Sequence, residues 1–157
     1  MLIELVDYEL TMKITYKGDY ALKALLYLAA HYGSNVITIH ELARQIDAPL
    51  KFLEQVLLEL KRGGFVESRR GNIGGYMLSR APSQMTVGEV IRFIDGPIEP
   101  IACVKHGYSE CADVYKCAFR KIWQNVAEAT SNVVDKVTFE TLAAETNARQ
   151  EALLYSI

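Results

Sequence analysis

The three cysteines of this chain lie close together, in a segment that reads CVKHGYSECADVYKC and has the pattern Cys-x7-Cys-x5-Cys. Thiolates bind soft metal ions and iron–sulfur clusters, and reactive thiols are also the groups that oxidants modify. Cys103, Cys111 and Cys117 are therefore candidates for a metal or cluster site or for a redox switch. An odd number of cysteines argues against a disulfide framework.

One histidine, His106, lies inside the same segment and is the competing ligand, since imidazole can replace a thiolate on iron. Three cysteines and one histidine would also suit structural zinc, although both cysteine spacings are wider than the pairs typical of zinc fingers. An enzyme is not indicated. Cys111 and His106 lack a third orienting group, and the chain has no phosphate-binding Gly-rich loop and no nucleophile elbow.

The overall charge of the chain hides a local basic cluster. The 157 residues are 50% hydrophobic and carry a formal net charge of -2, which suits one globular unit. Residues 61–80 nevertheless carry five basic side chains against one acidic side chain, a local charge of +4 that attracts phosphate. There is no apolar run of roughly 20 residues to span a membrane and no signal peptide, so we expect a cytoplasmic protein without a membrane partner.

Three helices and a small hairpin are predicted in the first half of the chain. Thr38 and Glu41 form a capping box for a helix of about two turns, and Pro49 suits the first position of a longer helix. The predicted boundaries are residues 16–31, 38–46 and 49–62 for the helices, and 65–69 and 76–79 for the two strands. A short helix, a tight turn, a longer helix and a hairpin make a winged helix-turn-helix. The predicted fold class is therefore mainly α with a small β-wing.

The third helix and the wing are the predicted contacts with DNA. A recognition helix presents its N-terminal residues to base edges, and wing cations hold phosphates or enter the minor groove. Lys51 suits guanine or phosphate, Glu54 suits cytosine and Gln55 suits adenine. The predicted DNA-binding residues are Leu50, Lys51, Glu54, Gln55, Arg69 and Arg70. The alternative is a protein-interaction module that controls a metabolic enzyme, with these charges forming a solvated face.

The second half of the chain is predicted to carry a long C-terminal dimerisation helix. Thr86 and Glu89 form another capping box, which begins a helix that ends shortly before the cysteines. A long helix then runs from residue 118 to about 135, and its apolar face, which includes Trp123, is larger than one small domain needs to cover. We expect Trp123 to lie in the core or the dimer interface. A short helix over residues 139–146 closes the pattern.

The chain is therefore divided into four predicted parts. They are an N-terminal extension (1–11), a winged helix-turn-helix DNA-binding domain (12–82), a linker helix with the cysteine loop (83–117), and a dimerisation helix with the C-terminal tail (118–157). The extension has no clear period, and Met12 opens the regular pattern. Met12 is therefore an alternative natural start.

Five short motifs in order resemble the Rrf2 family of bacterial winged-helix regulators. They are MKITYKGDYAL at 12–22, FLEQ at 52–55, RGNIGGY at 70–76, VGEV at 87–90, and three cysteines before a long helix. The resemblance covers about residues 12–146. It implies a homodimer that binds a near-palindromic DNA operator, as a repressor, and a cysteine loop that ligates an iron–sulfur cluster near the dimer helix.

The resemblance also bears on the fourth ligand of such a cluster. In one pattern of the family a histidine stands three residues after the last cysteine, and here that position is Arg120. In another pattern an aspartate near the start of the first helix, supplied by the other subunit, completes a 4Fe-4S cluster. Asp19 stands at the matching place. The resemblance thus implies Cys103, Cys111 and Cys117 with Asp19 in trans, a 4Fe-4S cluster with 2Fe-2S as the alternative, and zinc or a thiol redox switch as the competing readings.

Overall fold

The computed structural model describes residues 13–155, so the extension 1–11 and the alternative start at Met12 lie outside the described residues. The elements are α1 (Tyr16–Ala30), α2 (Ile39–Gln45), α3 (Leu50–Arg62), β1 (Val66–Arg69), β2 (Gly75–Leu78), η1 (Pro82–Gln84), α4 (Val87–Ile94), η2 (Ala102–Val104), α5 (Arg120–Val134) and α6 (Phe139–Tyr155). This winged, mainly helical fold confirms the predicted fold class. Within residues 13–155 no helix is both long enough and apolar enough to cross a membrane.

Helix α1 lies at the centre of the core because other elements cover it on several sides. It packs against α3, α4, α6 and β2. Its residues Ala21, Ala24 and Leu25 are fully buried, as are Leu53 and Leu57 of α3. Each of the leucine side chains that leaves water stabilises the fold by about 1.5–3 kcal/mol, and each alanine methyl group by less. The helix-turn-helix and α6 are therefore fixed to the same central helix.

The start of α1 is tied to the end of α4. The Thr15 hydroxyl accepts a hydrogen bond from the Gly18 amide at 3.1 Å and donates one to Asp95 Oδ1 at 2.5 Å. A Cβ atom at Gly18 would lie 2.1 Å from Asp95 Oδ2, so any other residue would displace the carboxylate that Thr15 binds. The chain that leaves α4 toward the cysteines therefore starts from a defined point beside α1.

The turn between α2 and α3 has the geometry of a helix-turn-helix. Thr38 accepts from the Glu41 amide at 3.2 Å, as predicted, but the Glu41 carboxylate accepts from the Tyr27 hydroxyl at 3.3 Å. Asp47 takes a left-handed conformation with φ of 50°. Pro49 precedes the helix as its extended N-cap rather than forming its first residue. The predicted start of α3 is therefore one residue early. The Pro49 carbonyl still accepts the first hydrogen bonds of the helix, from the Phe52 and Leu53 amides.

The wing is anchored to the segment that leads into α2. Strand β1 pairs antiparallel with β2, in a register that places Ser68 opposite Tyr76. Tyr76 also exchanges two backbone hydrogen bonds with Ile37, of 2.9 and 2.8 Å. A Cβ atom at Gly75 would lie 2.4 Å from the Ile37 carbonyl oxygen, so glycine permits this close approach. The base of the wing is thereby fixed relative to the helices.

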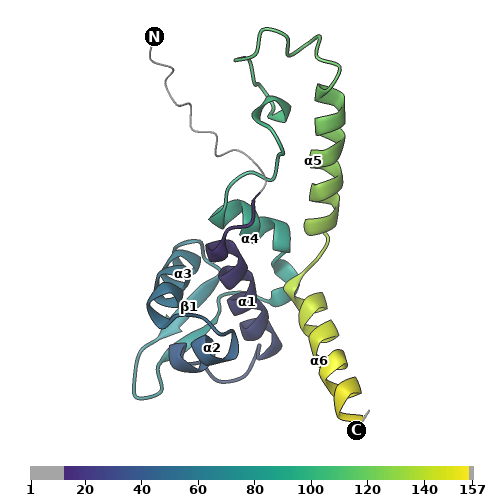
Figure 1. Ribbon diagram of the computed structural model, residues 1–157. Helices are drawn as coiled ribbons and strands as arrows, with labels where there is room; N and C mark the ends of the chain where they lie inside the picture. The colour runs from purple at the N-terminus through teal and green to yellow at the C-terminus, as the bar shows by residue number, and fades with distance from the viewer. Residues whose placement is uncertain (1–12, 156–157) are drawn as a thin grey trace.

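Helix α6 is longer than the predicted helix over 139–146. It runs to Tyr155 and returns to the body, where it packs on α1 (Figure 1). Phe139 at its start is 1% exposed, and the Phe139 amide donates to the Met85 carbonyl at 3.1 Å. No glycine or proline occurs between residues 139 and 155, so nothing in the sequence ends the helix early.

Helix α5 projects from this body together with the cysteine loop (Figure 1). It begins at Arg120, two residues later than predicted, and none of its residues is buried within the described chain. At its lower end the Arg92 guanidinium of α4 donates two hydrogen bonds to the Asp135 carboxylate, at 2.5 and 3.0 Å, and one to Ser131 Oγ at 3.0 Å. This bidentate pair fixes the angle at which α5 leaves the body.

We expect Asp135→Asn to destabilise the protein in a pH-dependent way. The Arg92 hydrogen bonds lower the pKa of Asp135 below its ordinary 3.8. A carboxylate with a lowered pKa stabilises the fold above its ordinary pKa, and this stabilisation is lost as pH falls through the folded-state value. Because both side chains are about two-fifths exposed, we expect a loss of about 0.5–1 kcal/mol at pH 7.

Calorimetry between pH 3 and pH 7 measures this loss. The difference in Tm between wild type and variant should shrink as the pH falls below about 4. Glu128→Gln, which removes an exposed carboxylate from the same helix, is the matched control and should change little. A difference as large at pH 3 as at pH 7 would contradict the ion-pair account.

Candidate cysteine site and nucleic-acid interface

The three cysteines line one open cavity of about 520 Å³. Its other walls are apolar or aromatic, and they are formed by Ile101, Ala102, Tyr108, Phe119 and Trp123. All three thiols are free. Cys103 is half-buried, whereas Cys111 and Cys117 are exposed. The fold therefore brings together side chains that are fourteen positions apart in sequence, against the start of α5.

Arg120 holds the first cysteine against the start of α5. Its Nε donates a hydrogen bond to the backbone carbonyl of Cys103 at 3.0 Å. Around Cys103 the chain forms the short helix η2, with amides of Val104 and Lys105 bonded to carbonyls of Ile101 and Ala102 at 3.3 and 3.1 Å. At the other end of the loop the Cys117 amide donates a hydrogen bond to the backbone carbonyl of Asp113 at 2.8 Å. Backbone contacts thus position the first and last thiols separately.

Tyr108 is the polar side chain of the cavity wall. Desolvation raises the pKa of its phenol, and the negative charges of Glu110, Cys111 and Cys103 raise it further. Tyr108 lines the same cavity as Cys103 and Cys111, so the phenol lies near two of the thiols. At neutral pH it is a neutral hydrogen-bond donor beside groups that become anionic when they bind a metal.

The single chain does not gather a complete ligand set. Across residues 13–155, no three His, Cys, Asp or Glu side chains are arranged to hold one metal ion. His106 is exposed and is not part of the cavity lining. Asp19 lies on α1, where its carboxylate pairs with Lys23 Nζ at 2.6 Å, and it lines a different cavity with residues 13–16. Neither predicted fourth ligand is brought to the cysteines of its own chain.

The predicted DNA-contacting residues lie on one helix and the adjoining wing. Lys51, Glu54 and Gln55 are exposed on the first two turns of α3, and Leu50 is half-buried beside them. Arg69 and Arg70 are exposed at the end of β1 and in the turn of the wing. The apolar face of α3 points the other way, since Leu53, Val56, Leu57 and Leu60 are all fully buried.

Part of the basic cluster is committed to internal contacts. Arg80 pairs with Glu89 of α4 and lies over the ring of Phe65, 5.5 Å from its centre. Lys61 Nζ donates to Ser68 Oγ at 2.6 Å and so joins α3 to β1. Neither Arg69 nor Arg70 is paired with an acidic residue of the described chain, so these two charges are available to a phosphate backbone.

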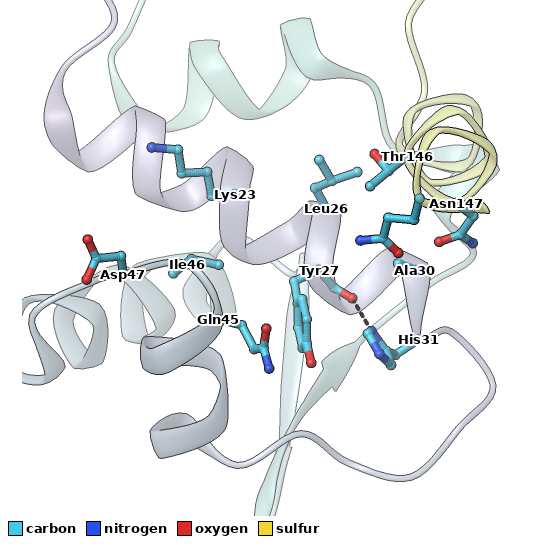
Figure 2. Close-up of a pocket in the computed structure, with 11 residues that line it drawn as sticks. Lys23, Leu26, Tyr27, Ala30, His31, Gln45, Ile46, Asp47, Thr146 and Asn147 are labelled. Carbon is cyan, nitrogen blue, oxygen red and sulfur yellow. Dashed lines mark hydrogen bonds between the residues drawn. The ribbon is translucent and has the colours of Figure 1, made fainter. Parts of the chain in front are cut away.

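A third cavity, of about 480 Å³, lies between α1, the helix-turn-helix turn and α6 (Figure 2). Leu26, Ala30 and Ile46 line its apolar part, and Lys23 and Asn147 are among its polar groups. His31 Nδ1, on its rim, is bonded to the Tyr27 carbonyl at 2.8 Å. The cysteines take no part in this cavity. It separates α6 from the turn that leads into α3.

Three structural features in or near the site were not anticipated from the sequence. Trp123, predicted to lie in the core or the dimer interface, is 38% exposed in the described chain, and it also lines the cysteine cavity, which the sequence did not suggest. Arg120 was noted only as a position where a ligand was absent, yet it contacts Cys103. The pair of Arg92 and Asp135 spans 43 positions, and no local pattern signals a contact over that distance.

The chain thus combines a winged helix-turn-helix with a projecting helix whose apolar face is exposed. A loop that forms a cysteine-lined cavity connects the two parts. Residues 14–145 match the Rrf2 family, described as an iron-dependent transcriptional regulator. The chain belongs to the Rrf2 family of transcriptional regulators.

Relatives of this chain include IscR and CymR. The transcriptional regulator IscR of Aliivibrio salmonicida is 30% identical, over 88% of this chain and 82% of the relative. The structure of CymR, described as the global cysteine regulator of B. subtilis, superposes with a TM-score of 0.73 at 31% identity and covers 86% of this chain and 98% of CymR. An oxidized form of Staphylococcus aureus CymR has a TM-score of 0.68 at 28% identity, over 84% and 96% of the two chains.

We expect Arg120→Ala to loosen the backbone around Cys103. Loss of this hydrogen bond, worth about 1 kcal/mol because it is only partly buried, should raise the exchange rates of the Val104 and Lys105 amides up to about fivefold. Alkylation of Cys103 in the metal-free protein should accelerate similarly, whereas the already exposed Cys111 should react at its wild-type rate. Hydrogen exchange and mass spectrometry measure both effects. Lys121→Ala on the next position is the matched control, and equal rates in all three proteins would contradict the assignment.

Proposed function

We propose that the chain acts as a homodimer that binds a near-palindromic DNA operator, with an affinity set by an iron–sulfur cluster at Cys103, Cys111 and Cys117. The observation that carries this proposal is the single cavity that the three thiols share with Phe119 and Trp123. The cavity lies at the start of α5, the helix that the described chain leaves exposed. A change inside the cavity can therefore act on the helix that pairs two subunits.

The exposed face of α5 supports the homodimer. Ile122 is 52% exposed, Val126 is 41% exposed and Val133 is 65% exposed. These residues recur at helical spacing and form one apolar stripe, which a soluble protein covers with another surface. A second copy supplies a matching stripe, because a two-fold dimer places the same patch on both sides.

The donor set supports an iron–sulfur cluster more than structural zinc. Zinc needs four ligands around one ion, and the described chain offers no such group. The thiolates of a cluster bind different iron atoms, so they need only line a common cavity. When bound, the cluster supplies a redox-active and ligand-exchanging centre. Asp19 from the partner subunit is the proposed fourth ligand of a 4Fe-4S cluster, with 2Fe-2S as the smaller alternative.

Two contacts connect the cavity, through α5, to the body that carries α3. Arg120 joins Cys103 to the start of α5, and Arg92 joins α4 to the end of α5. A shift of the loop would therefore turn α5 against the body that carries α3. In a dimer this changes the separation of two recognition helices, which must match half-sites about 34 Å apart. Ligand binding to the cavity alters operator affinity only to the extent that it favours one separation.

A second candidate function is a thiol redox switch on the same scaffold. Cys111 and Cys117 are exposed free thiols, which oxidants can reach. One similar structure is of an oxidized form of CymR. Peroxide treatment of metal-free protein separates the candidates. A reversible change in operator affinity that Cys111→Ser abolishes would support the thiol switch, and no change would exclude it.

Anaerobic native mass spectrometry should find a dimer that carries one cluster per subunit, with the added mass of iron and sulfide distinguishing 4Fe-4S from 2Fe-2S. Cys103→Ser, Cys111→Ser and Cys117→Ser should each lose it, because a thiolate ligand is removed.

Asp19→Ala should weaken cluster retention while leaving the dimer intact, and Glu110→Ala is the matched control. Loss with His106→Ala instead would assign the fourth ligand to His106. A colourless protein with stoichiometric zinc, or with no metal, would overturn the cluster.

Arg69→Ala with Arg70→Ala should weaken operator binding and lower the slope of log affinity against log salt by about two, since each arginine neutralises about one phosphate. Fluorescence anisotropy at several salt concentrations measures this slope. Lys136→Ala with Arg149→Ala removes two exposed charges outside the predicted interface and should leave it unchanged. Unchanged binding in the wing variant would favour the protein-interaction module.

A further inference from the structure

The turn of the wing presents an apolar side chain that the fold does not use. Ile73 is 77% exposed. It stands between Gly71, whose φ is 137°, and Gly74, where a Cβ atom would lie 3.0 Å from the Arg69 carbonyl oxygen. Backbone therefore fills the inner side of this tight turn. The isoleucine is left at the tip of the hairpin, where a polar residue would be the ordinary choice.

The position of this tip relative to α3 is fixed by contacts at the base of the wing. Tyr76 is bonded to Ile37 on one side, and Lys61 of α3 is bonded to Ser68 on the other. The tip also carries cations without acidic neighbours, because residues 69–78 contain Arg69 and Arg70 and no aspartate or glutamate. A polyanion that contacts the N-terminal half of α3 would thus meet two arginines and one isoleucine at the wing.

We propose that Ile73 contacts the floor of the DNA minor groove as an apolar wedge, beside the predicted half-site base contacts of α3. The inference rests on the proposed DNA binding. Arginine side chains are favoured in narrow minor grooves, and apolar side chains there open base steps that unstack easily. Ile73 thereby makes binding depend on how easily the DNA deforms at the wing. It favours a flexible pyrimidine–purine step there, outside the bases that α3 contacts.

The test begins with the full chain, purified anaerobically, and a duplex of about 30 bp that the wild-type protein selects from a random pool, long enough for two half-sites. Ile73→Ser should bind this duplex about five- to tenfold more weakly, the loss of one packed apolar contact, with the same salt slope because no charge is removed. Replacing the flexible step at the wing by a stiff step should weaken wild type by a similar factor and leave Ile73→Ser unaffected. 2-Aminopurine placed in that step should brighten on binding wild type only.

Matched controls separate the possible failures. Leu154→Ser changes another exposed apolar residue, 75% exposed near the end of α6, and should bind like wild type. Equal Tm values for Ile73→Ser and wild type verify that the fold is intact. If wild type selects a duplex but Ile73→Ser binds it equally well and with the same dependence on the step, the wedge is wrong and the regulator stands. If wild type selects no duplex, the proposed operator binding fails and the wedge with it.

Discussion

The apolar face of α5 is the constraint on which the rest of this structure depends. No residue of α5 is buried in the described chain, although Ile122, Val126 and Val133 form a continuous stripe. Leaving such a stripe in water is unfavourable, so it favours association with a second copy. The cysteine cavity shares Trp123 with this helix. Any group bound in the cavity is therefore next to the proposed interface, without a long path of communication.

The opposite constraint applies to the DNA-binding body, which has little internal freedom. Helix α1 is covered on several sides, and α6 returns to pack against it. The wing is fixed at Tyr76, and the glycine at 75 allows a backbone approach that any side chain would block. A closely packed body moves as a unit. Regulation that acts through α5 would consequently change where the two bodies stand, and leave the shape of each recognition surface unchanged.

Local patterns in the sequence predicted most of the fold. The hydroxyls of Thr38 and Thr86 cap their helices as expected, because a cap is a contact between residues three apart. The same two capping boxes are only half formed, since Glu41 and Glu89 contact Tyr27 and Arg80 instead. These glutamates bind partners that tertiary packing brings close to them. A local sequence pattern does not show which residues from other elements will lie nearby.

The site shows the same division between local and distant information. The cysteine spacing identified the thiols, and the position of the loop before a long helix indicated where they lie. The sequence did not place Trp123 in their cavity or direct Arg120 to the Cys103 carbonyl, because both depend on how the loop folds back on α5. Likewise, helical periodicity predicted a helix from Phe139 but not its full length. The second half of α6 lacks a regular apolar stripe, but its residues favour a helix and include no glycine or proline, so the helix continues.

The incomplete ligand set of a single chain has a thermodynamic consequence for the proposed sensor. The Arg120 side chain is bonded to the Cys103 carbonyl, and the cavity of the described chain gathers three thiols without a histidine, aspartate or glutamate among its lining residues. If Asp19 of the partner subunit supplies that donor, a complete ligand set exists only in the dimer. Linkage then requires that cluster binding and dimerisation strengthen each other by the same factor. Loss of the cluster would weaken the pairing of two DNA-binding bodies, even with every protein–DNA contact unchanged.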